Sequence, residues 1–157
     1  MAITPTGWIS SGLLAVEDII AGSTNHRTLM GVATDPADRA LIYWQDFRGA
    51  KSTPFTCISI VSGRNEESEA LRVVHHADVV EVYLVWPVSK VGATTDKDIT
   101  TIATNALGGV LSDIDALINT GSYLFRARRE WLAPSRTADN GPHPGCWESL
   151  LTFSWEV

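Results

Sequence analysis

The first periodic segment of the chain runs from about residue 8 to residue 21. Its apolar residues recur three or four positions apart, the spacing that places side chains on one face of an α-helix. Gly22 follows directly, and glycine commonly ends a helix. The pattern predicts an amphipathic N-terminal helix whose apolar face holds Ile9, Leu13, Val16 and Ile20.

A second, longer helical pattern extends from about residue 95 to residue 119. Thr95 or Asp96 can cap its first turn, where acidic side chains also complement the helix dipole. Gly108-Gly109 lies mid-helix at a cost of about 1 kcal/mol per glycine relative to alanine, which indicates either a close crossing of neighbouring backbone or a kink. The expected apolar stripe comprises Ile99, Ile102, Ala106, Leu107, Val110, Leu111, Ile114, Leu117 and Ile118.

Strand patterns occupy much of the remaining chain. Both alternating faces of residues 79–87 are apolar, which is typical of a central strand. Residues 147–157 instead alternate apolar with polar, which is typical of a sheet with one buried face. The order of elements predicts an α+β fold: a mixed or antiparallel β-sheet with the N-terminal helix and one long helix packed on one face. The expected strands are residues 39–47, 54–61, 70–75, 79–87, 123–131 and 147–157.

Three polar segments are less determined by pattern. Residues 23–40 are turn-rich: Asp35-Pro36 can begin a short helix, or a strand can begin near residue 39, which β propensity favours. We interpret residues 62–69 (SGRNEESE) as an acidic loop or hairpin tip. Residues 133–145, with three prolines and two glycines, are expected to form a loop.

Length and composition indicate one globular domain over residues 1–157, with 45% hydrophobic and 19% charged residues. The net charge of −6 argues against free nucleic acid as a partner, because phosphate backbones are repelled. The first eight residues lack the features of a signal peptide, and the longest apolar run is too short to span a bilayer. Cys57 and Cys146 are expected to be reduced thiols, although a single disulfide stays open to them. These properties predict synthesis in a cytoplasm and no membrane association.

Motifs that carry catalysis are scarce. Gly-rich phosphate loops, GxSxG and HExxH are absent from the sequence. His75-His76 with Asp78 is the best metal-like cluster, but adjacent strand residues point to opposite faces, so the imidazoles converge only in a turn. His143 could activate the Cys146 thiol, yet no carboxylate nearby in sequence would orient the imidazole. We interpret these segments as a polar turn and a flexible loop, and expect no catalytic residue, no metal, no cofactor and no enzymatic activity.

Basic residues gather in the strand expected over residues 123–131. An exposed sheet face with ordinary ion pairs would explain them. A subunit contact would explain them as well, because arginine is favoured where planar pairing with carboxylates is needed. In a ring of identical subunits, the arginines of one copy could meet the acids of the next. The candidate contact residues are Arg126, Arg128, Arg129, Glu66, Glu67, Glu69, Asp96 and Asp98.

The order of these segments resembles the tail terminator proteins of long-tailed phages, the lambda-like family in particular. The N-terminal helix leads through a polar stretch to Arg39-Ala40-Leu41-Ile42 and the strand near residues 55–61. Residues 79–87 (VVEVYLVWP) look like that family's central strand ending in proline, and residues 111–117 (LSDIDAL) are similar to the second half of its long helix. A Gly-containing loop, a tryptophan and a final strand complete a likeness that covers most of the chain as short matches.

This resemblance implies a single tail-terminator-like domain in a non-enzymatic virion protein. Such proteins form a ring, usually of six, that caps the tail tube, ends its polymerisation and joins it to the head connector. The implied partners are other copies of the chain, the tail tube protein and the connector protein, at the tail–head junction of the virion. DNA would only pass through the lumen, and an acidic subunit suits that passage because a negative lumen does not retain DNA.

Three other classes of function remain open. Another phage neck or head–tail connector subunit would also form a ring, and sequence alone separates the two poorly. A small-molecule-binding domain, or an enzyme with an unfamiliar site, would show a deep apolar pocket with converging polar groups. A nucleic-acid-binding module would need a larger basic face than three arginines provide.

Overall fold

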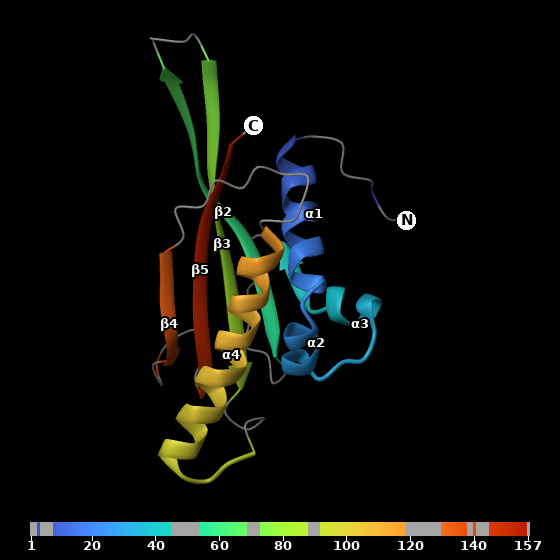
Figure 1. The fold of residues 1–157 in the computed structure, drawn as a ribbon, viewed down its shortest axis with the longest axis vertical. Coiled ribbons are helices and arrows are strands. Elements are labelled where there is room, and N and C mark those ends of the chain that lie inside the picture. Colours follow the sequence, from blue (N-terminus) through green and yellow to red (C-terminus); the bar gives the residue numbers. More distant parts are fainter. Residues whose placement is uncertain are drawn as a thin grey trace.

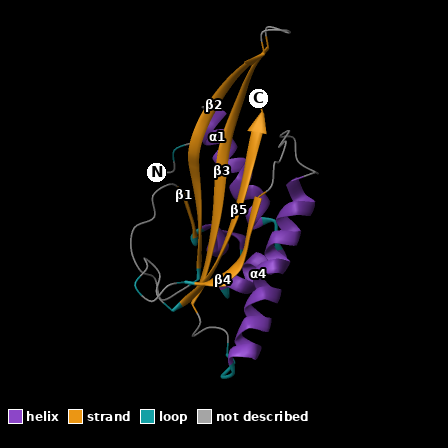
Figure 2. Cartoon of the chain, turned by 90° about the vertical axis from the view of Figure 1, so that its left-hand side faces the viewer, coloured by secondary structure: helices purple, strands orange, loops and turns teal. Residues whose placement is uncertain are grey.

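The computed structural model describes residues 3, 8–44, 54–68, 73–87, 92–118, 130–137, 140 and 145–156. In this part of the chain, a β-sheet carries helices on one face (Figures 1 and 2). The predicted α+β fold is therefore confirmed. In chain order the elements are α1 (Trp8–Ala21), α2 (Thr24–Met30), α3 (Asp35–Arg39), β1 (Ile42–Trp44), β2 (Phe55–Ser68), β3 (Val73–Pro87), α4 (Asp96–Ile118), β4 (Glu130–Arg136) and β5 (Cys146–Glu156).

The sheet has the strand order β1-β2-β3-β5-β4. β1 runs parallel to β2, whereas the other three pairs are antiparallel, so the sheet is mixed. β3 lies in the middle, as its two apolar faces predicted. Val80, Val82 and Leu84 expose 0% of their surface on the helix-covered face, and Val85 exposes 1% on the other.

β2 and β3 form one long hairpin, which bears on two sequence predictions. Of the two alternatives for residues 62–69, a loop or a hairpin tip, the structure favours the hairpin, because residues 62–68 continue β2 in its distal part. The strands expected over residues 70–75 and 79–87 are one strand, β3 (Val73–Pro87). The pairing continues from Phe55↔Val85 to Ser68↔Val73, with one register shift between Ile60 and Ser62. Such a bulge inserts one residue and increases the local twist without ending the pairing. Glu69 and the rest of the turn lie outside the described residues.

The polar stretch after α1 is more helical than predicted. Both alternatives for its second half occur in succession, because α3 begins at Asp35 with Pro36 in its first turn and β1 begins at Ile42. Arg39 therefore belongs to a helix rather than to the strand. The preceding helix α2 was not predicted. Ser23 caps its first turn and Gly31 ends it in the left-handed conformation, with φ of 71°.

The C-terminal strands also shift relative to the prediction. β4 begins at Glu130, so most of the strand expected over residues 123–131 lies outside the described residues. Residues 133–136 belong to β4 instead of the expected loop. Pro134 is accommodated at a register shift between Leu132 and Ser135, where an edge strand tolerates a missing amide hydrogen. β5 matches the predicted last strand within a residue at each end.

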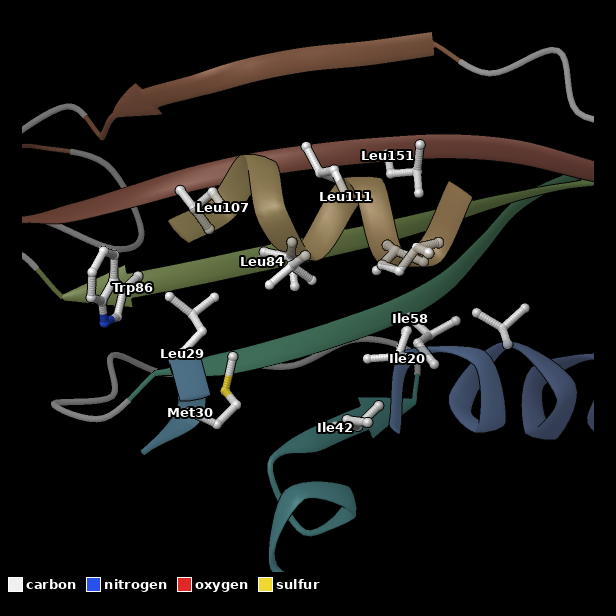
Figure 3. Close-up of a cluster of buried hydrophobic side chains, with 14 of the residues drawn as sticks. Ile20, Leu29, Met30, Ile42, Ile58, Leu84, Trp86, Leu107, Leu111 and Leu151 are labelled. Atoms are coloured by element: carbon white, nitrogen blue, oxygen red, sulfur yellow. The ribbon is translucent and has the colours of Figure 1, made fainter. Parts of the chain in front are cut away.

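The main core lies between the sheet and the helices (Figure 3). Fully burying an aliphatic side chain of this kind contributes about 1.5–3 kcal/mol. The stripe predicted for α4 is largely confirmed, but Ile102 is 39% exposed and Ala103 is buried in its place. The figure labels Ile20, Leu29, Met30, Ile42, Ile58, Leu84, Trp86, Leu107, Leu111 and Leu151 of this cluster.

Candidate functional site

A hydroxyl, an imidazole and a carboxylate form one buried hydrogen-bonded chain. His26 on α2 lies 2.9 Å from Asp38 on α3 through Nδ1 and 2.7 Å from Thr56 on β2 through Nε2. This order of groups is the one that serine and threonine hydrolases use for nucleophilic attack. All three residues, however, are completely buried, with 0% of their surface exposed. No substrate therefore reaches the hydroxyl. The chain of bonds therefore joins two helices to the sheet rather than performing catalysis.

Sequence reasoning missed these three residues. They lie 12 and 30 positions from one another and belong to no spacing motif. The Ser23 cap is the one local signal, since its hydroxyl oxygen accepts a hydrogen bond from the His26 amide at 3.0 Å. That cap begins α2 and so directs the imidazole inward.

A second polar contact joins α2 to α4. The Asp113 carboxylate on α4 accepts hydrogen bonds from the Ser23 hydroxyl at 2.7 Å and from the Asn25 side chain at 3.0 Å. Gly109 faces the same place, where a Cβ would lie 3.4 Å from Asn25, whereas a Cβ at Gly108 would meet nothing within 4 Å. The neighbour of Gly109 is a side chain at an ordinary contact distance, so neither glycine lies at the close backbone crossing that the sequence predicted.

Arg39 joins α3 to α1 through three carboxylates. Its Nη1 lies 2.7 Å from Asp18 and 3.3 Å from Glu17, and its Nε lies 2.8 Å from Asp35. Glu17 also accepts a hydrogen bond from the Trp44 indole on β1. Partial burial acts to lower the pKa of Arg39, but the hydrogen bonds and charges of Asp35 and Asp18 outweigh it and raise the pKa. Arg39 thus stays charged and links α3 to α1 through ion pairs.

The helix-free face of the sheet carries a smaller apolar cluster around Phe55, Val85 and Cys146. Beside it, Tyr83 on β3 donates a hydrogen bond to Glu148 on β5. Burial raises the pKa of the Glu148 carboxyl above its ordinary value. A half-buried acid of this kind is a common feature of functional sites, but no second acid accompanies it among the described residues of this cluster.

The two cysteines do not form a disulfide. Cys57 pairs with Tyr83 and Cys146 with Pro87, on opposite sides of β3. Four residues along the strand and two strand spacings place the two Cα atoms roughly 16 Å apart, well beyond the span of a disulfide. Burial raises the pKa of the Cys146 thiol, which is the opposite of what an activated nucleophile requires. His143 lies outside the described residues.

The histidine pair predicted to lie in a polar turn belongs to β3. His75 pairs with Glu66, and His76 pairs with Asn65. Adjacent strand positions lie on opposite faces, so the pair does not converge on one ion. Within the described residues, no group of three or more histidine, cysteine or acidic side chains could hold a metal ion. No helix among them is long and apolar enough to cross a membrane.

A pocket of about 400 Å³ opens at the end of the sheet, between α2 and the start of β2. Its volume lies at the lower end of the range for small-molecule sites. Among the described lining residues, Thr28 and the Trp86 indole carry the polar side-chain groups, and none of these residues is charged. The lining comprises Thr28, Leu29, Met30, Gly31, Val32, Leu41, Pro54 and Trp86.

The acidic candidates for subunit contact lie in two separate places. Glu66 and Glu67 belong to the distal part of the β2–β3 hairpin, which projects beyond the rest of the sheet (Figure 1). Asp96 and Asp98 lie in the first turn of α4 at the opposite end of the molecule, where Thr95 caps the helix by accepting a hydrogen bond from the Asp98 amide at 3.2 Å. The two acidic groups therefore cannot form one contact surface.

The arginines predicted to meet these acids, Arg126, Arg128 and Arg129, lie outside the described residues, as does Glu69. In the sequence, the arginines directly precede β4, which is an edge strand of the sheet. The predicted contacts stay predictions.

The fold of this chain is similar to folds among solved structures. No family model and no curated protein matches the sequence. The fold is similar to that of a chain in a solved structure described as "Virion of native gene transfer agent (GTA) particle", with a TM-score of 0.50 and 10% sequence identity. The match covers 96% of this chain and 98% of the other, so the similarity concerns the whole fold rather than a shared fragment.

Proposed function

We propose that this chain is a structural protein of a phage-like virion, and that it forms a ring that caps the tail tube and joins it to the head connector. The observation that carries the proposal is the similarity of fold to a chain of a gene transfer agent particle over nearly the full length of both chains. The order of segments that resembles lambda-like tail terminators points to the same class independently.

The chemistry of the described residues is consistent with a structural role. The hydroxyl–imidazole–carboxylate chain of Thr56, His26 and Asp38 is sealed from solvent, and the Cys146 thiol has a raised pKa. Among the described residues, this buried chain of bonds is therefore closed to substrate, and the Cys146 thiol is not activated as a nucleophile. A net charge of −6 suits a ring through which DNA passes without adhering.

Electron microscopy of particles made without this chain tests the proposal. We expect tail tubes of uncontrolled length and heads without attached tails, with both defects corrected when the chain is supplied from a plasmid. Tails of normal length that fail to join heads would instead identify a neck or connector subunit. Particles of normal appearance and infectivity would refute a virion role.

A further inference from the structure

Asn140 lies in the connection between β4 and β5, where it is exposed and part of a turn. The next residue in the sequence is Gly141, and no other asparagine of the chain precedes a glycine. A short amide side chain readily contacts backbone groups close to it in sequence, and glycine has no Cβ to obstruct that approach. The pair therefore joins an exposed side-chain amide to the least hindered neighbour that a sequence can supply.

Asn25, at the start of α2, is also exposed, but its surroundings hold it in place. Its side-chain nitrogen donates a hydrogen bond to the Asp113 carboxylate at 3.0 Å. The following peptide nitrogen, that of His26, donates to the Ser23 hydroxyl at 3.0 Å. Because both nitrogens are engaged, a reaction between the side chain of Asn25 and the next peptide unit requires these bonds to break.

Asn105 on α4 is exposed as well. Within an α-helix each amide hydrogen is donated to the carbonyl four residues earlier, so the peptide nitrogen of Ala106 is occupied. Helical side chains also lean toward the N-terminus of the helix, away from the nitrogen of the next residue. Of the three exposed asparagines in the described residues, Asn140 alone lies outside a helix and precedes a glycine.

We propose that Asn140 is a site of spontaneous, non-enzymatic modification, at which the side-chain amide is converted to a carboxylate. The peptide nitrogen of Gly141 attacks Cγ of Asn140, so that an N–Cγ bond forms and the Cγ–Nδ2 bond breaks. The proton of the attacking nitrogen leaves with the amide nitrogen as ammonia, and a cyclic succinimide remains. Water then opens the ring at either carbonyl and gives aspartate or isoaspartate. The reaction needs only water and is independent of the function proposed above.

The fold confines the effect of either product to the connection itself. The Thr137 amide donates to the Cys146 carbonyl at 3.0 Å, and the Cys146 amide donates to the Thr137 hydroxyl at 3.1 Å, so the two ends of the segment that contains Asn140 are fastened to each other. Isoaspartate adds a methylene group to the main chain, and these bonds keep the extra length out of the pairing of β4 with β5. Either product adds one negative charge, which takes the formal net charge from −6 to −7. Copies of the chain therefore differ in charge according to their age.

Incubation of the full-length chain at mildly alkaline pH tests the proposal, because the attacking nitrogen loses its proton more readily there. Mass spectrometry of proteolytic peptides measures the exchange of NH2 for OH at each asparagine over time. We expect conversion at Asn140 to be at least about tenfold faster than at Asn25 or Asn105, whose hydrogen bonds oppose the reaction. An Asn140 peptide that keeps its mass, or equal conversion at all three positions, would overturn the proposal.

The same measurement in urea separates the effect of the fold from that of the sequence. Unfolding removes the hydrogen bonds of Asn25 and of the helix around Asn105, so both should react at least about fivefold faster than in the folded chain. The rate at Asn140 should change by less than about threefold, because its amide is exposed in both states. A rate at Asn140 that is at least about tenfold lower in the folded chain than in urea would show that the fold protects this residue, and would refute the site.

Substitution of the following glycine gives a second, independent test. Gly141→Ala should slow conversion at Asn140 at least about tenfold, because the added Cβ obstructs the approach. Gly108→Ala is the matched control: its Cβ would meet nothing within 4 Å, and conversion at Asn140 should stay unchanged. Circular dichroism confirms that both variants are folded. A folded Gly141→Ala chain that converts as fast as the original chain would contradict attack by this nitrogen.

Discussion

The imidazole of His26 lies 2.9 Å from the carboxylate of Asp38, and neither residue is exposed to solvent. The same ring reaches Thr56 on β2 with its other nitrogen. Because a buried polar group without a partner costs about 1–3 kcal/mol, one side chain determines how α2, α3 and the sheet fit together.

Removal of this imidazole should destabilise the fold strongly. His26→Ala leaves the Asp38 carboxylate and the Thr56 hydroxyl unpaired in the interior and should lower the free energy of unfolding by about 3–5 kcal/mol. Thr56→Val keeps the volume and removes one partner, at a cost of about 1–3 kcal/mol. Urea denaturation measures both. Thr101→Val on the exposed face of α4 is the matched control, with an expected change within about 0.5 kcal/mol; equal effects at positions 56 and 101 would contradict the role of the buried network.

The two adjacent glycines of α4 should respond differently to alanine. Gly108→Ala adds a methyl group in open space and should stabilise the helix by about 0.5–1 kcal/mol. Gly109→Ala should stabilise less, because its methyl group would lie 3.4 Å from the Asn25 side chain, which hydrogen-bonds Asp113. Thermal unfolding of the two variants measures the difference. An equal gain at both positions would mean that α2 does not restrict this part of α4.

Glu148 should make stability depend on pH. Burial raises its pKa in the folded chain above the ordinary value of a glutamate, so the folded state binds this proton more tightly than the unfolded state does. Its contribution is therefore favourable at low pH and is lost as pH rises through the folded pKa. Glu148→Gln keeps an acceptor for Tyr83 and removes the titration. Relative to this variant, the original chain should lose stability as pH rises through the folded pKa of Glu148, as urea titrations at each pH measure; parallel profiles would contradict the assignment.

The ion pairs of Arg39 should contribute modestly and depend on salt. The Arg39 side chain is 31% exposed, so Arg39→Ala should cost about 1 kcal/mol at low ionic strength. The cost should shrink in 1 M salt, where the screening length falls to about 3 Å. The stability of Arg39→Lys should lie between those of the original chain and Arg39→Ala, because a lysine ammonium cannot contact three carboxylates with the geometry of a guanidinium. A cost that does not change with salt would assign the effect to packing of the side-chain stem instead.

The elements with the strongest periodicity were predicted closely from the sequence. α1 has the predicted bounds, α4 differs by a residue at each end, and the central position of β3 follows from its two apolar faces. These elements are long and make most of the main core, so their hydrophobic pattern directly reflects where they are buried.

Shorter and more polar elements depend on distant partners that no local pattern reveals. α2 has seven residues, and the acid that bonds its capping Ser23 is Asp113, 90 positions away. The distal half of β2 has the composition of a loop, but its pairing with β3 outweighs the low strand propensity of its polar residues. The same reason explains why the buried network of His26 was missed: it is a tertiary contact without a sequence motif.

The position of β5 determines when the sheet can be completed during translation. β5 lies between β3 and β4 but follows both in the chain, and β4 has no other strand partner in the described part. While the chain is still being translated, one side of the apolar strand β3 stays unpaired, and β4 lacks its strand partner until residues 146–156 emerge. β4 therefore takes its final place in the sheet only after translation has passed residues 146–156.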